Sequence, residues 1–139
     1  MTQSGTVQKT ETVPIQSSSD VVVVRQRVRA WTTEMKFSLV EQTKIVTAAS
    51  EIARNTVDYG RGGDLRMDAV HNGLKSGLRL TFSDQGPGIR DIEQALTDGF
   101  TSGNGMGLGL GGTRRLMDEF DIISRPNEGT TVTITKWSR

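Results

Sequence analysis

The sequence predicts an α/β protein, built as a two-layer sandwich with helices on one face of a mixed, mostly antiparallel sheet. In the first part of the chain, apolar residues recur at every third or fourth position, which is typical of helices that bury one face. Beyond Gly63, apolar and polar residues alternate in several short runs, which is typical of strands. Helices followed by hairpins favour one helical layer against one sheet.

Length and composition narrow the function before any motif is considered. The chain has 139 residues, a formal net charge of +1 and no cysteine. This length suits one domain, and without cysteine there is neither a disulfide framework nor a thiol nucleophile. The balanced charge gives no reason to expect nucleic acid or an anionic membrane as a partner. Because no apolar run approaches a membrane span and the N-terminus lacks a signal pattern, we expect a soluble, cytoplasmic protein.

The N-terminal region predicts a tail, a short strand and a helix. Residues 1–12 are mostly polar, so we expect a flexible tail that precedes a folded domain over residues 13–139. Residues 13–16 predict a short edge strand, a place where Pro14 is tolerated. The next helix has an apolar stripe of Val21, Val24, Val28 and Trp31.

A second helix and the remaining elements follow from their boundary residues. Ser38 and Glu41 have the spacing of a capping box, which predicts a helix start, and Gly60 predicts its end. Asn72 and Gly73 predict the turn of an antiparallel hairpin. The other predicted elements are strands around 65–69 and 78–82, a short helix at 91–98, a glycine-rich loop at 99–112, a helix over 113–119 whose start can lie within the last glycines of that loop, and strands at 121–124 and 130–137.

Two polar residues of the second helix are the first candidates for chemistry. Glu51 and Asn55 are four residues apart, so they share one helix face. A carboxylate there can take a proton from an attacking hydroxyl group or water. A carboxamide oxygen can coordinate Mg²⁺, which prefers oxygen ligands. The alternative is that both residues belong to a solvated helix face, as charged residues commonly do.

The first glycine-rich segment is Asp84-Gln85-Gly86-Pro87-Gly88, at the end of a predicted strand. Gly86 and Gly88 permit a positive φ and the close approach of a ligand. A carboxylate held at Asp84 can accept a hydrogen bond from the exocyclic amine of adenine. The alternative is an ordinary turn, because turns are rich in Asp, Gly and Pro.

The second glycine-rich segment spans Gly103–Leu110. Glycine alternates there with Asn104, Met106 and Leu108, and unhindered backbone amides in such a run can wrap a phosphate chain. A flexible linker is the alternative, but linkers usually contain serine, proline and charge rather than regularly spaced apolar residues. The segment lacks the Gly-Lys-Ser/Thr ending of a Walker A loop and does not open a βαβ unit.

Together these segments resemble the GHKL ATPase superfamily, over roughly residues 13–137. Glu51–Asn55 resembles its N-box, and the two glycine-rich segments resemble its glycine boxes. The resemblance implies the Bergerat ATP-binding fold, ATP and Mg²⁺ as cofactors, Glu51 as the catalytic base and Asn55 as the magnesium ligand. The nucleotide-binding residues that it implies are Asn55, Asp84, Gly86, Gly88, Gly103, Gly105, Met106, Gly107, Leu108, Gly109 and Thr130.

Within that superfamily the chain is most similar to bacterial anti-sigma-factor-type serine/threonine protein kinases, in particular the stressosome switch kinases. The similarity rests on Arg115–Phe120 and Lys136–Trp137. It implies phosphorylation of a STAS-domain protein, with a downstream regulator or sigma factor as a further partner. Residues 107–112 depart from this subgroup, because their glycine content is closer to that of histidine kinases.

Two rival functions remain from the sequence. A histidine-kinase catalytic domain would need a helical hairpin with a phospho-accepting histidine, and no such hairpin is found in the sequence. An ATP-dependent binding module would sequester a regulator without phosphorylating it, and an ATP site alone is compatible with that output.

Overall fold

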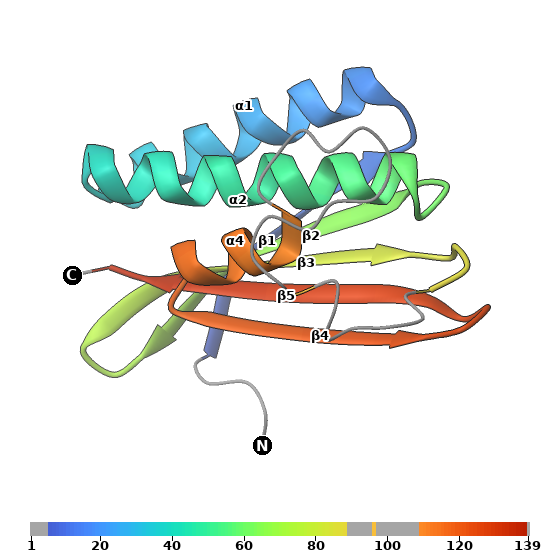
Figure 1. Cartoon of the computed structure of the whole chain (residues 1–139). Coiled ribbons are helices and arrows are strands. Elements are labelled where there is room, and N and C mark those ends of the chain that lie inside the picture. The colour runs from blue at the N-terminus through green and yellow to red at the C-terminus, as the bar shows by residue number, and fades with distance from the viewer. Residues whose placement is uncertain (1–5, 89–95, 97–108, 139) are drawn as a thin grey trace.

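The computed structural model describes residues 6–88, 96 and 109–138. Helices cover one face of a sheet, and Figure 1 shows α1 and α2 lying across the same side of the strands as α4. The elements of the described residues are β1 (Thr6–Ile15), α1 (Ser18–Glu34), α2 (Leu39–Asp58), β2 (Gly63–Asn72), β3 (Lys75–Asp84), α4 (Gly109–Leu116), β4 (Glu119–Arg125) and β5 (Gly129–Trp137).

The strand order confirms the predicted two-layer α/β sandwich. The sheet runs β1-β2-β3-β5-β4, and each of the four pairings that the structure describes is antiparallel. The prediction of a mixed sheet allowed a parallel pairing, and the described strands contain none. β5 lies between β3 and β4, which brings the end of β3 beside the start of β5.

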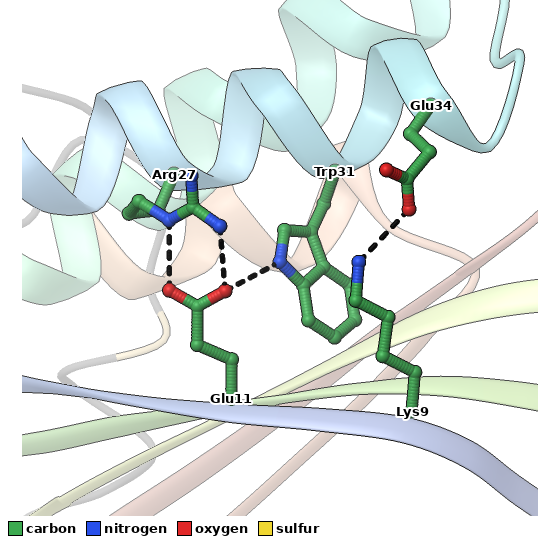
Figure 2. Close-up of polar contacts among 5 residues, drawn as sticks. All are labelled: Lys9, Glu11, Arg27, Trp31 and Glu34. Atoms are coloured by element: carbon green, nitrogen blue, oxygen red, sulfur yellow. Dashed lines mark hydrogen bonds and ion pairs between the residues drawn. The ribbon is translucent and has the colours of Figure 1, made fainter.

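The predicted tail is wrong for residues 6–12. These residues belong to β1, which pairs with β2 from Thr6 opposite His71 to Ile15 opposite Gly63. Polar composition misled the prediction, because the strand is held by its backbone ladder and by ion pairs to α1. Figure 2 shows Glu11 of β1 bonded to Arg27 and Trp31 of α1. Residues 1–5 lie outside the described residues, as do the predicted helix at 91–98, apart from residue 96, and most of the loop at 99–112.

The structure confirms the two long helices that the sequence predicted. Val24, Val28 and Trp31 are buried on α1. On α2, the Ser38 hydroxyl group accepts the backbone N–H of Glu41 at 3.1 Å, which is half of the predicted capping box. The Glu41 carboxylate instead forms an ion pair with Lys136 of β5, at 3.3 Å.

The apolar core lies between the helices and the sheet. The helices and strands contribute fully buried side chains to it, among them Ile45, Ile52, Leu65, Met67, Leu80 and Ile134. The predicted hairpin is also confirmed, since Asn72 opposes Lys75 across the turn that contains Gly73. None of the described helices is long and apolar enough to cross a membrane.

Candidate functional site

The C-terminal half of α2 presents the first two predicted site residues. Glu51 is buried, with 6% of its surface exposed, and Asn55 one turn later is half-buried. The Glu51 Oε1 atom accepts a hydrogen bond from Arg54 Nη1 at 3.1 Å. This bond partly offsets the cost of burying a carboxylate. Glu51 is therefore not the freely solvated side chain that the alternative interpretation required.

Asp84 ends β3 and joins two distant segments of the chain. Its Oδ1 atom accepts the backbone N–H groups of Gly86 at 2.9 Å and of Thr130 at 3.2 Å. Burial raises the pKa of Asp84, and the hydrogen bonds from Gly86 and Thr130 oppose that rise. Among the described residues, no hydrogen bond is given to Oδ2 of Asp84. The described hydrogen bonds thus fix Asp84 through one carboxylate oxygen, Oδ1.

The end of α2 packs directly against this carboxylate. A Cβ atom added to Gly60 would lie 2.5 Å from the Asp84 carboxyl group, and one added to Gly86 would lie 2.7 Å from the Gly60 Cα. The Gly60 N–H also donates to the backbone oxygen of Asn55, at 3.1 Å. Asn55, Gly60, Asp84 and Gly86 therefore form one continuous contact. Sequence reasoning identified Gly60 only as a helix breaker and missed its place beside Asp84.

Thr130 and Gly88 complete this part of the site. The Thr130 hydroxyl group lies 2.8 Å from the Ser124 hydroxyl group of β4. Gly88 has φ of +79°, a conformation that side chains rarely adopt, and its Cα faces the Arg125 carbonyl group closely enough to exclude a Cβ atom. Both observations require glycine at position 88, as the prediction from its backbone freedom expected. Sequence reasoning missed Ser124, because a single serine in a predicted strand carries no signal of its own.

The second glycine box lies mostly outside the described residues. Gly103, Gly105, Met106, Gly107 and Leu108 are not described, so their predicted contact with phosphates stays a prediction. The last members of the box are described, since Gly109 begins α4 and Leu110 is buried in the core.

The second glycine box ends in the first residues of α4. Gly109 has φ of +69°, and its carbonyl group accepts a hydrogen bond from the Thr113 hydroxyl group at 3.0 Å. The box therefore runs directly into the N-terminus of a helix, an end that favours anionic groups. The helix begins at Gly109, within the glycines in which the sequence allowed it to start, and it ends at Leu116 rather than at the predicted 119.

Asn55 is the predicted magnesium ligand, and its carboxamide oxygen is of the donor type that Mg²⁺ prefers. Among the described residues, no group of three or more His, Cys, Asp and Glu side chains is arranged to hold a metal ion. The described structure also gives the Asn55 carboxamide no hydrogen bond. One protein oxygen, completed by phosphate oxygens and water, is the coordination that Mg²⁺ commonly adopts with nucleotides.

Comparison with known proteins adds sequence relatives to this geometry. A family model described as a histidine kinase-like ATPase domain matches residues 16–136. The chain is 42% identical over 127 residues to the serine/threonine-protein kinase RsbT of Bacillus subtilis, covering 91% of this chain and 96% of RsbT. It is 32% identical over 117 residues to the anti-sigma F factor of Anoxybacillus flavithermus, covering 81% of this chain and 80% of that protein.

Two solved structures share the fold. The RsbU and RsbW domains of a Mycobacterium tuberculosis protein match with a TM-score of 0.68 and 21% identity, over 95% of this chain and 33% of that one. The SiaB-SiaC complex of Pseudomonas aeruginosa matches with a TM-score of 0.55 and 12% identity, over 94% of this chain and 90% of the other. At these identities the likeness concerns the fold alone.

Proposed function

Because the chain belongs to the histidine kinase-like ATPase domain family, we propose that it is an ATP-dependent serine/threonine protein kinase. The acceptor is a STAS-domain protein in a bacterial partner-switching pathway, in the cytoplasm. The identity of 42% with a serine/threonine-protein kinase over nearly the full length of both chains supports this activity. The observation that carries the proposal is the buried Glu51 carboxylate, one turn from Asn55 on a helix that ends against Asp84.

Each described site residue has a defined part in this reaction. Asp84 Oδ2 accepts a hydrogen bond from the adenine amine. The backbone N–H of Thr130 holds the other carboxylate oxygen, Oδ1, in place. Asn55 would hold Mg²⁺, which would neutralise charge on the phosphates. The backbone amides of residues 103–109, most of which lie outside the described residues, would bind the phosphates together with the glycines of the first box, Gly86 and Gly88.

The chemical step follows from the position of Glu51. The acceptor hydroxyl oxygen forms a bond to the γ-phosphorus, the bond from that phosphorus to the bridging oxygen breaks, and ADP leaves with the electron pair. Glu51 takes the hydroxyl proton. Such catalysis rests mainly on positioning and on neutralisation of charge, so a rigid helix is a suitable support for the base.

A binding module that sequesters a regulator is the second candidate, and the similarity to anti-sigma F factors favours it. The two outputs are separated by incubating the protein with γ-labelled ATP, Mg²⁺ and each purified STAS-domain protein of the same genome. A kinase transfers label to one of them, and Glu51→Gln abolishes most of the transfer. A tight ATP-dependent complex with a regulator and no label on any STAS-domain protein would identify a binding module instead.

A further inference from the structure

Glu51 has one ion-pair partner among the described residues, and that partner is Arg54 of the same helix. The contact is between Arg54 Nη1 and Glu51 Oε1, at 3.1 Å. The described structure gives no hydrogen bond to the second carboxylate oxygen, Oε2. Within the part of the chain that the structure describes, the two oxygens of this buried carboxylate therefore differ, because the contact with the cation is made through Oε1.

We infer that Arg54 is a positioning residue for phosphoryl transfer, which holds Glu51 by Oε1 and leaves Oε2 to accept the hydroxyl proton. The inference rests on the proposed function, since it assigns a support to the base of that reaction. A helix fixes residues three positions apart on one face, so the guanidinium group limits the rotation of the carboxylate. Reacting groups that are held in the correct orientation account for a large part of enzymatic rate enhancement.

Charge gives the second reason for a cation at this place. The γ-phosphate group brings negative charge toward a carboxylate that must itself be ionised to act as a base, and like charges disfavour the ionised form. Arg54 supplies a fixed positive charge beside Oε1. About half of its side chain is exposed, at 48% of its relative surface. An arginine carries five N–H donors, and the described structure shows one of those of Arg54 bound to Glu51.

The alternative is an ordinary helix-surface ion pair, which contributes about 0.3–0.5 kcal/mol of stability and nothing to catalysis. The burial of Glu51 argues against that alternative, because a surface pair would leave both partners in water. The two roles predict different kinetics. A structural pair affects the stability of the fold, whereas a positioning pair affects kcat with little change in the KM for ATP.

The test compares Arg54→Ala, Arg54→Lys and Glu51→Gln in the transfer assay with the labelled STAS-domain protein, with Arg29→Ala as the matched control. Arg29 is an exposed arginine of α1, outside the site. We expect Arg54→Ala to lower kcat about 10- to 100-fold, a share of the roughly 10²–10⁴-fold that general base catalysis supplies. The KM for ATP and the Mg²⁺ requirement stay close to wild type. Arg54→Lys restores part of the rate, and Arg29→Ala behaves as wild type.

A double variant makes the inference specific to Glu51. If Arg54 acts through Glu51, Arg54→Ala removes little further activity in the Glu51→Gln background. Equal losses in both backgrounds, or a wild-type kcat for Arg54→Ala, would overturn the inference while the kinase assignment stands. Transfer at the wild-type rate by Glu51→Gln would remove Glu51 as the base and overturn the inference with it, whereas the absence of transfer by the wild-type protein would overturn the kinase assignment. Thermal unfolding of each variant shows whether a lower rate reflects loss of fold.

Discussion

At the scale of single residues, the proposed site contains two carboxylates in which the described hydrogen bonds reach one oxygen only. Asp84 Oδ1 is occupied by two backbone N–H groups, and Glu51 Oε1 is occupied by Arg54. In each case the described residues give the second oxygen no hydrogen bond. Glu51 is buried and Asp84 is partly buried, and a carboxylate that is removed from water has a cost in free energy unless donors complete it. Under the proposed function, the adenine amine supplies the donor at Asp84 Oδ2 and the acceptor hydroxyl group supplies the donor at Glu51 Oε2.

The first prediction concerns Asp84→Asn. The change keeps the shape of the side chain but removes the negative charge, so the bond to the adenine amine is no longer charge-assisted. We expect ATP affinity to fall about tenfold or more, because hydrogen bonds to charged groups contribute roughly 1.5–3 kcal/mol. Isothermal titration calorimetry measures the loss. Wild-type protein should also prefer ATP to GTP, and equal affinity for the two nucleotides would contradict the role of Asp84.

The second prediction concerns Asn55→Ala. The substitution removes the carboxamide oxygen that we assign to Mg²⁺ and leaves the helix intact, since alanine is a strong helix former. We expect the dependence of ATP binding on Mg²⁺ to be lost. Titrations with and without Mg²⁺ test this, with the neighbouring surface substitution Asp58→Ala as a control. A normal Mg²⁺ requirement in Asn55→Ala would refute the assignment.

At the scale of elements, the junction between β1 and α1 shows how a polar segment becomes part of the sheet. Arg27 binds both carboxylate oxygens of Glu11, each at 2.7 Å, and the Trp31 indole N–H donates to the same carboxylate at 2.9 Å (Figure 2). Lys9 lies 4.5 Å from the centre of the Trp31 ring, within the range of a cation–π interaction. These contacts replace the apolar packing that the composition of the segment lacks.

The third prediction follows from the pKa of Glu11. The Arg27 hydrogen bonds, helped by Trp31, lower that pKa from its usual 4.5 to about 2. A lowered pKa in the folded protein means that the stabilisation is present above the unfolded value and is lost as the pH falls from about 5 toward 2. We expect the free energy of unfolding of the wild type at pH 7 to exceed that of Glu11→Gln by on the order of 1–2 kcal/mol. The difference is no larger because Glu11 is partly exposed, and solvent screens its interaction with Arg27.

Urea unfolding at several pH values between 7 and 3 measures this difference in unfolding free energy. Other carboxylates titrate in both proteins, so the difference isolates Glu11. Glu34→Gln is the matched control, because Glu34 belongs to the same junction but is highly exposed. A difference between wild type and Glu11→Gln that stays constant across the pH range would show that the junction does not depend on the charge of Glu11.

At the scale of the whole molecule, local sequence patterns predicted the helices and strands but did not predict the contacts between distant elements. Ser38, Asn72 and Gly73 act within a few residues, so their sequence signals were sufficient. The bond from Thr130 to Asp84 joins residues 46 positions apart and depends on β5 lying beside β3. That strand order has no local signal. The strand at residues 6–12 was not predicted for the same reason, because its partners lie on β2 and α1.

The fourth prediction treats the domain as one cooperative unit that is linked to its ligand. A nucleotide that binds the folded chain alone stabilises it by about 2.7 kcal/mol when its concentration is 100 times its Kd. For a domain of this size we expect Mg-ATP to raise the Tm by roughly 8–15 °C. Differential scanning calorimetry tests this with Mg-GTP as the control nucleotide. Asp84→Asn should lose most of the shift and Arg54→Ala should keep it, because we place Asp84 in adenine binding and Arg54 in positioning the base. A Tm shift that is the same for Mg-ATP and Mg-GTP, and is kept by Asp84→Asn, would show that the nucleotide does not bind at the contact of α2, β3 and β5.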